Sequence, residues 1–277
     1  MIDFEDAIQS TLTRLNEEHS HTELDPFTFH ASQLAKCPRQ CYASKLGLLD
    51  TTDALGTFHT GTAIHEYMEA EVIPQLSVET QREVPIEMDV DGLHIIGHAD
   101  LYEPGTNTVY DYKSRANWYK FSPPIQRHLD QVYVYMKALG ASQGQIVYLS
   151  KADLEVRTWP PQSAGIESFA FEPGRFQDLV EKGQQIAATI IDRGYPTCED
   201  EIPFEKDDCW FCSKESLQFD HLETEIDPSL DFGLIDASPP DADDGGTTST
   251  PAATDGGEEQ PSGDDHGEST STSATET

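Results

Sequence analysis

The sequence predicts an α/β fold in which helices flank a mixed central sheet. Segments typical of helices and strands follow one another in the order helix, three strands, helix, strand, which is the pattern of a layered α/β domain. The strand segments are short and rich in β-branched and aromatic residues, and turn-forming residues separate them. The sequence contains no internal repeat.

Three helices are expected before the first strand. Residues 2 to about 20 form an amphipathic pattern. Ser32 can cap a second helix, in which Pro38 should kink or restart the chain. A third helix should follow Gly56 and stop before Pro74.

The strands should begin with a hairpin, because Asp91-Gly92 is a dipeptide that favours tight turns. The next strand carries the tripeptide DYK and follows a turn at EPGTN. A helix from about Pro124 to Leu139 should end at Gly140 as its C-cap. The first three strands are expected at residues 77–88, 93–102 and 108–114. Two later strands are expected at 144–151 and 154–159, and a long final helix at 173–193.

Three charged side chains in the hairpin region indicate a site for a divalent cation. Side chains alternate along a strand, so Asp111 and Lys113 point to the same face, and pairing with the preceding strand brings Asp100 near Asp111. Two carboxylates and an ammonium group would be costly to bury for packing alone. Around a hard cation they supply oxygen ligands, while the lysine can help to deprotonate a water or offset charge on a phosphate. The pattern is typical of a metal-dependent phosphodiesterase.

Three further residues gain meaning from their position next to these acids. His65 lies in the third helix, where a lone histidine is more often an ordinary surface or core residue; as a ligand it suits Mn²⁺ better than Mg²⁺. Gln131 and Tyr135 are four residues apart and share one face of a helix. There they can orient the lysine, a water or a phosphate, although an apolar helix face explains the same spacing.

One basic stretch in an acidic chain predicts contact with nucleic acid. The formal charge is −34, from 17 Lys and Arg against 51 Asp and Glu. Cations and flat rings nevertheless gather between residues 113 and 127, and nucleic-acid bases stack on such rings. The alternative is a scattering of basic residues among ordinary core aromatics. The candidate DNA-binding residues are Arg115, Trp118, Tyr119, Lys120 and Arg127.

The acidity also bears on host and location. Acidic residues are abundant throughout the chain, which suits a halophilic host, because at molar salt the Debye length is about 3 Å and like charges are screened. The alternative is a protein that binds basic partners.

From residue 221 onward the chain has the composition of a disordered tail, without Lys or Arg. No apolar run approaches the roughly 20 residues that span a bilayer, and the acidic start is unlike a signal peptide, so we expect a cytoplasmic protein.

Five cysteines at two loci indicate a metal site rather than disulfides, because the protein is expected to be intracellular. Cys209 and Cys212 form a CxxC pair, Cys198 lies eleven residues before it, and a fourth thiolate must come from Cys37 or Cys41. Four thiolates suit either Zn²⁺ or a [4Fe–4S] cluster, and the spacing leaves both open. Unligated thiols are the remaining alternative.

Taken together, the motifs resemble those of the PD-(D/E)XK nuclease superfamily in its RecB-like branch, and most closely the CRISPR-associated exonucleases of the Cas-four type. The resemblance covers roughly residues 30–215. The histidine of the branch matches His65 in GTAIHE, the acid of the GxxD motif matches Asp100 in GHAD, the acid-x-Lys motif matches Asp111 and Lys113, with Asp where many members have Glu, and the QxxxY motif matches Gln131 and Tyr135.

The resemblance implies a restriction-endonuclease-like core and a nuclease that hydrolyses single-stranded DNA from its ends. It implies Mn²⁺ or Mg²⁺ held by His65, Asp100, Asp111 and the backbone carbonyl of Tyr112. It also implies a structural [4Fe–4S] cluster, held by one N-terminal and three C-terminal cysteines.

The cysteines depart from the family pattern in one respect. Cys37 matches the usual N-terminal ligand better than Cys41 does. Relatives generally place a further cysteine closely after the CxxC pair, whereas here no cysteine follows Cys212 and Cys198 precedes the pair. The ligand set of the cluster is therefore less closely matched than the catalytic set.

The resemblance also sets the expected domains and partners. Residues 1–29 should form an N-terminal helix and linker, residues 30–220 the nuclease domain, and residues 221–277 an acidic disordered tail. Within the nuclease domain, the cysteine site should join the N-terminal helices to a C-terminal loop. Single-stranded DNA and proteins of CRISPR integration or of recombination are the expected partners; no feature demands an oligomer. The alternatives are a virus- or plasmid-borne nuclease, and an inactive clamp that binds DNA ends, against which the intact catalytic set argues.

Overall fold

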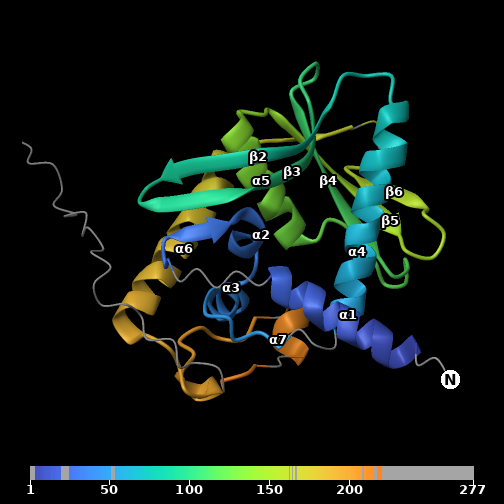
Figure 1. Ribbon diagram of the computed structural model, residues 1–277. Helices are drawn as coiled ribbons and strands as arrows, with labels where there is room; N and C mark the ends of the chain where they lie inside the picture. The colour runs from blue at the N-terminus through green and yellow to red at the C-terminus, as the bar shows by residue number, and fades with distance from the viewer. Residues whose placement is uncertain are drawn as a thin grey trace, which may run out of the picture. The chain divides into compact units, whose positions relative to one another are not determined.

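The computed structural model describes residues 4–19, 25–50, 54–161, 163, 165, 167–207, 209–214 and 217–219. Within them the α/β class is confirmed, because helices flank a seven-stranded mixed sheet (Figure 1). The helices are α1 (Phe4–His19), α2 (Ala31–Leu34), α3 (Pro38–Lys45), α4 (Leu55–Tyr67), α5 (Gln126–Leu139), α6 (Pro173–Arg193) and α7 (Trp210–Lys214). The strands are β1 (Thr28–His30), β2 (Gln81–Val90), β3 (Leu93–Glu103), β4 (Thr108–Arg115), β5 (Gln143–Ser150), β6 (Val156–Trp159) and β7 (Phe169–Ala170).

The strand order is β1-β3-β4-β5-β6, with β2 paired to β3 and β7 paired to β5. The expected hairpin is β2 and β3, which pair antiparallel, and β4 pairs antiparallel with β3. The helix α5 then crosses over so that β5 pairs parallel with β4. The predicted core order is therefore confirmed by α4, β2, β3, β4, α5 and β5.

Helices cover both faces of the sheet. On one face Ile64 and Met68 of α4 pack with Leu101, Tyr112 and Leu149. On the other face α2, α5 and α6 pack on the central strands and α3 packs against α2 and α6, and together they enclose the larger apolar core. Successive residues of β4 and β5 belong alternately to the two clusters, as the pleat of a strand requires. The strand β4 thus lies between α4 and α5 (Figure 1).

The N-terminal region differs from the single kinked helix that was expected. The chain forms β1 first, and His30 rather than Ser32 occupies the N-cap position of α2. The expected restart at Pro38 is confirmed, because α3 begins there; proline suits the first turn of a helix, where its missing N–H is not needed. Cys37 caps α3, and its Sγ accepts a hydrogen bond from the backbone N–H of Gln40.

Other boundaries shift by a few residues. The helix α4 begins at Leu55, so Gly56 lies inside it, and it continues as a π-helical turn (Met68–Val72) and a 3-10 turn (Ile73–Gln75). The helix α5 begins two residues later than expected and ends as predicted at Gly140, whose φ of 64° favours glycine. The strands β1 and β7 were not expected, since two or three residues are too few to show a periodic pattern.

Among the described residues, none of the helices is both long and apolar enough to cross a membrane. The acidic tail expected from residue 221 lies outside the described residues.

Candidate active site

The pairing of β3 with β4 ends next to two carboxylates. The register pairs Leu101 with Tyr110 and goes no further in that direction, so Asp100 and Asp111 occupy the point where the two strands diverge. Asp100 is buried, and its Oδ2 accepts a hydrogen bond of 2.6 Å from the backbone N–H of Tyr112. The Asp100 carboxylate thus accepts the hydrogen bond that a backbone carbonyl of a paired strand would otherwise accept, and this bond holds it against β4.

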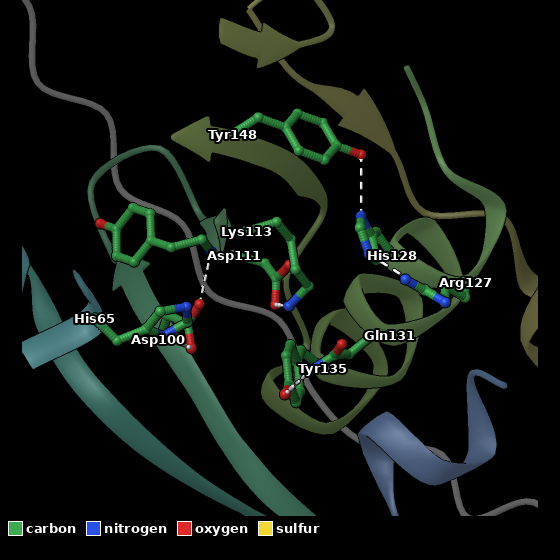
Figure 2. A network of polar contacts seen from close by, with 10 residues as sticks. His65, Asp100, Asp111, Lys113, Arg127, His128, Gln131, Tyr135 and Tyr148 are labelled. Atoms are coloured by element: carbon green, nitrogen blue, oxygen red, sulfur yellow. Dashed lines mark hydrogen bonds and ion pairs between the residues drawn. The ribbon is translucent and has the colours of Figure 1, made fainter. Parts of the chain in front are cut away.

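Asp111 is fully buried and only partly satisfied. Its Oδ1 accepts a hydrogen bond of 2.7 Å from Lys113 Nζ, as their spacing along β4 allows (Figure 2). Its Oδ2 has no hydrogen-bond partner in the part of the chain that the structure describes. Burial raises the pKa of Asp111 to about 6; Asp100 adds to the rise, and Lys113 opposes it. A buried carboxylate oxygen without a partner is costly, and a bound cation would satisfy it.

The helix α4 brings His65 to the same place. Its Nδ1 lies 3.7 Å from Asp100 Oδ1 (Figure 2), and its ring meets that of Tyr112 edge-on. Burial, and then Lys113, lower the pKa of His65, so the imidazole is neutral at pH 7 and retains a lone pair for a metal. The N–H and C=O of a strand residue point the same way, so the carbonyl of Tyr112 faces the side on which its N–H meets Asp100.

The predicted ligands lie together but do not form a compact set. Among the described residues, the ligand atoms of His65, Asp100 and Asp111 do not all lie within 4.8 Å of one another. Asp100 is held by the backbone N–H of Tyr112, and Asp111 is held by the ammonium of Lys113. Two carboxylates, an imidazole and a carbonyl fit Mn²⁺ well, and Mg²⁺ through the oxygen donors.

Gln131 and Tyr135 project from α5 toward the carboxylates, and Gln131 Nε2 donates a hydrogen bond of 2.6 Å to Tyr135 Oη (Figure 2). The spacing of four residues places both on one face of α5, as predicted. Burial, and then the charge of Asp111, raise the pKa of Tyr135, so its hydroxyl remains protonated and can donate.

A cavity of about 900 Å³ opens beside these residues, between α4, β4 and the start of α5. Its lining divides by charge. Its acidic residues are Glu66 of α4, Glu69 of the π-helical turn that follows it and Glu83 of β2, and His65 also lines it. The basic wall consists of Lys113, Arg115, Arg127 and Lys151, with His128 beside them.

The sequence reasoning missed several of these lining residues. Glu69 lies one helical turn after His65, and this spacing could have identified it. Glu83 comes from β2, and burial together with a hydrogen bond to Glu69 raises its pKa to about 7. No local signal marks Glu83 or Lys151, because both reach the cavity only through the fold. His128 also carries no signal of its own in the sequence, yet it is buried against the cavity.

The structure divides the predicted DNA-binding residues into two groups. Arg115 and Arg127 line the cavity, whereas Trp118, Tyr119 and Lys120 are not part of its lining. Tyr119 is 75% exposed, with the ammonium of Lys120 5.3 Å from the centre of its ring. Tyr119 and Lys120 therefore form an exposed surface outside the cavity, whereas Trp118 is half-buried and packs against Phe121.

These features agree with a comparison against protein-family models, in which residues 70–216 match the PD-(D/E)XK nuclease superfamily. The match covers more than half of the chain. The chain belongs to the PD-(D/E)XK nuclease superfamily. Asp100, Asp111 and Lys113 lie within the matched span, and His65 lies just before it. Its RecB-like branch stays a prediction.

Solved structures with a similar arrangement share little sequence with this PD-(D/E)XK chain. They include the protein SSO0001 (18% identity over 67% of this chain and 87% of that one, TM-score 0.48). The alkaline exonuclease LHK-Exo from Laribacter hongkongensis is 13% identical over 60% of this chain and 88% of that one, with a TM-score of 0.44. A putative exonuclease from Eubacterium rectale is 11% identical over 73% and 93%, with a TM-score of 0.39. None of the curated proteins compared matches significantly.

This PD-(D/E)XK chain also gathers three cysteines at a second site. Cys37, at the start of α3, lies with Sγ 3.6 Å from Cys209 Sγ and 3.8 Å from Cys212 Sγ. The three sulfurs all lie within 4.8 Å of one another. Burial raises the pKa of Cys37 and of Cys212, whereas hydrogen bonds from the Cys212 backbone N–H and from the neighbouring thiols lower that of Cys209. A bound metal would hold all three as thiolates together. Three converging sulfurs are a donor set for Zn²⁺ or an iron–sulfur cluster.

The other two cysteines lie outside this group. Cys198 is exposed and precedes a 3-10 turn (Glu199–Glu201). Cys41 is fully buried one turn into α3. The structure therefore brings Cys37 rather than Cys41 to the CxxC pair, and it leaves Cys198 apart from them.

Proposed function

We propose that the protein is a metal-dependent DNA nuclease that acts as an exonuclease on single-stranded DNA. The observation that carries the proposal is the buried Oδ2 of Asp111, which lacks a hydrogen-bond partner among the described residues and lies beside Lys113, Asp100 and His65. Membership of the nuclease superfamily supports phosphodiester hydrolysis. The preference for the ends of single strands rests on the resemblance to the Cas-four type.

In this proposal His65, Asp100, Asp111 and the carbonyl of Tyr112 hold Mn²⁺ or Mg²⁺. The cation, when bound, offsets charge on the phosphate and lowers the pKa of a water. Both carboxylates bind it in their ionised form, and His65 binds it in its neutral form, which burial already favours.

Lys113 is placed to act on the reacting phosphate. Its ammonium lies at the edge of the cavity, held at 2.7 Å by Asp111, and can turn to a phosphate oxygen or to the attacking water. It stabilises the negative charge that develops during hydrolysis. The Gln131 amide and the Tyr135 hydroxyl project from α5 toward the carboxylates (Figure 2) and, in this proposal, keep the lysine or a phosphate in place.

Digestion of end-labelled single-stranded DNA tests the function. With Mn²⁺ the protein should release labelled short products, and a chelator should stop the reaction. Circular single-stranded DNA has no end and should resist digestion under the same conditions. Cleavage without a divalent ion would contradict the metal requirement, and equal digestion of circles would contradict the exonuclease mode.

We also propose that Cys37, Cys209 and Cys212, with Cys198 as fourth ligand, hold a structural metal centre. The resemblance implies a [4Fe–4S] cluster, and Zn²⁺ is the alternative that the same thiolates accept. In either case the centre ties α3 to α7, which are more than 160 residues apart in the chain. The exposed position of Cys198 requires its loop to move toward the other three sulfurs.

Cys209→Ser is expected to remove the metal and to lower the stability of the fold by several kcal/mol, because binding of a structural metal contributes directly to folding. Metal content, visible absorption and melting temperature of anaerobically purified protein provide the measurement. Cys41→Ala is the matched control and should keep the metal. A brown, iron-containing wild type identifies the cluster and a colourless, zinc-containing one identifies zinc, whereas wild type purified without either metal would contradict the proposal.

The resemblance supports a role in CRISPR adaptation or in DNA repair and recombination, with the integration or recombination proteins as partners. The charge of −34 supports a halophilic host and a cytoplasmic setting of high salt. Assays are therefore best performed in molar KCl, where repulsion between this acidic chain and DNA is screened.

A further inference from the structure

The basic wall of the cavity carries cations that no carboxylate neutralises. Lys113 is paired with Asp111. In contrast, Arg115, Arg127 and Lys151 form no ion pair with any residue that the structure describes. The chain has 51 acidic residues for 17 basic ones, so a cation without an acidic partner is unexpected, and three in the lining of one cavity indicate a place for an external anion.

Arg115 is held in the wall by packing. It follows Lys113 by two residues on β4, so both side chains leave the same face of the strand. Its guanidinium carbon lies 4.4 Å from the centre of the Phe121 ring, and its Nε is buried without a hydrogen-bond partner among the described residues. The flat ring fixes the plane of the guanidinium without using its N–H donors.

Arg127 is oriented by a relay of two buried side chains. Its Nε donates to His128 Nε2 at 3.4 Å, so the hydrogen of the neutral imidazole is on Nδ1, which donates to Tyr148 Oη at 3.2 Å (Figure 2). Burial, and then Lys113, Arg127 and Arg115, lower the pKa of His128 to about 2, so the ring remains neutral and keeps its acceptor. The terminal NH₂ groups of Arg127 have no hydrogen-bond partner among the described residues and remain available to a ligand.

Lys151 extends the wall to the first turns of α4. Its Nζ donates a hydrogen bond of 2.7 Å to the carbonyl of Thr57. A Cβ atom on Gly61 would lie 3.3 Å from Ser114 Oγ and 3.9 Å from Lys151 Nζ. The glycine therefore permits the close approach of α4 to the end of β4. Ser114 alternates with Lys113 and Arg115 along the strand, so Lys151 lines the cavity from the α4 side of β4, opposite these two side chains.

We propose that Arg115 and Arg127 bind a second phosphate of the substrate strand, distinct from the one that is cleaved. The proposal rests on the proposed nuclease function. The step from Lys113 to Arg115 spans about 7 Å along β4, which is similar to one nucleotide of an extended single strand. Guanidinium groups match phosphate oxygens with several N–H donors. His128 is then a positioning residue for Arg127 rather than a catalytic one.

Binding measured without cleavage tests the site independently of the nuclease activity. All proteins carry Asp111→Asn, and the probe is a single-stranded oligonucleotide whose affinity is followed over a range of salt concentrations. Adding Arg127→Gln should weaken binding about tenfold and reduce the slope of log affinity against log salt by about 0.7, the value for one phosphate contact on a single strand. Lys137→Gln, at the other end of α5, is the matched control and should leave both values unchanged.

The two sources of the phosphate are separated by the choice of oligonucleotide. In one arm, single linkages are made neutral as methylphosphonates; in the other, oligonucleotides carry a phosphate or a hydroxyl at each end. One neutral linkage, or one terminal hydroxyl, should weaken binding by the parent protein and have no further effect on the Arg127→Gln protein. The modification that weakens binding by the parent protein but not by the Arg127→Gln protein then shows whether the contacted phosphate is internal or terminal.

Equal sensitivity of parent and Arg127→Gln proteins to every such modification would overturn the proposal, and so would an unchanged salt slope. His128→Leu should reproduce the loss seen in Arg127→Gln, whereas His128→Gln, which keeps an acceptor, should retain most of the binding. Melting temperatures confirm that each variant is folded. Failure of the wild type to cleave DNA would refute the proposed function while leaving these binding results interpretable.

Discussion

Asp111→Asn is expected to abolish cleavage of DNA and, at the same time, to make the metal-free protein more stable. Burial raises the pKa of Asp111 to about 6 from its ordinary 3.8. That difference corresponds to about 3 kcal/mol, at about 1.36 kcal/mol for each pH unit. Asparagine has the shape of the carboxyl group without the buried charge, so at pH 7 the variant should unfold at a higher temperature than the wild type.

Because the pKa of Asp111 is raised on folding, the free energy of unfolding of the metal-free protein should fall as the pH rises. A carboxyl group whose pKa is raised on folding binds more protons in the folded state, so its contribution to stability is fully present below about pH 4 and is lost as the pH rises to about 6. Thermal unfolding in a chelator, between pH 4 and pH 8, should show this decline in the wild type and a smaller one in Asp111→Asn. Addition of Mn²⁺ should stabilise only the wild type. A variant that is less stable than the wild type at pH 7 would contradict the account.

Lys113→Gln is expected to reduce the rate of cleavage by at least about 100-fold, the size of the effect when one donor to a developing negative charge is removed. The loss should fall on kcat more than on KM, because the ammonium contacts the phosphate mainly when charge develops. Removal of the ammonium also leaves Asp111 without the partner that holds its Oδ1, so the pKa of Asp111 should rise further above its ordinary value.

Single-turnover digestion of labelled single-stranded DNA measures this effect. Lys120→Gln is the matched control, because Lys120 lies over the exposed Tyr119 ring and not in the lining of the cavity. It should change affinity for DNA without changing the rate of the chemical step. Wild-type rates in Lys113→Gln, combined with an inactive Asp111→Asn, would remove the lysine from the mechanism.

The parts of the site that follow local periodicity could be predicted from the sequence. Asp111 and Lys113 share a face because a strand repeats every two residues, and Gln131 and Tyr135 share a face because a helix repeats every 3.6. Asp100 could be placed beside Asp111 from the hairpin pattern, since the turn between β3 and β4 limits the register. These local rules also account for the correct order of the core elements.

The remaining parts depend on packing between distant segments. Glu83 enters the cavity from β2 and Lys151 from the end of β5, and neither carries a local signal. His128 looked like one more helical residue, and only the position of Tyr148 beside it gives it a role. The cysteines show the same limit: the spacing left Cys37 and Cys41 open, and the start of α3 at Pro38 turns Cys37 toward Cys209 and Cys212.

Crystals soaked in Mn²⁺ provide the most direct measurement, through the anomalous scattering of the ion. If the two strands diverge in order to seat a cation, one strong anomalous peak should contact the carboxylates of both Asp100 and Asp111, with Oδ2 of Asp111 as a ligand at about 2 Å, a typical metal–oxygen distance. Saturating Mn²⁺ that binds elsewhere, with Asp111 Oδ2 still without a partner, would contradict the metal-dependent mechanism.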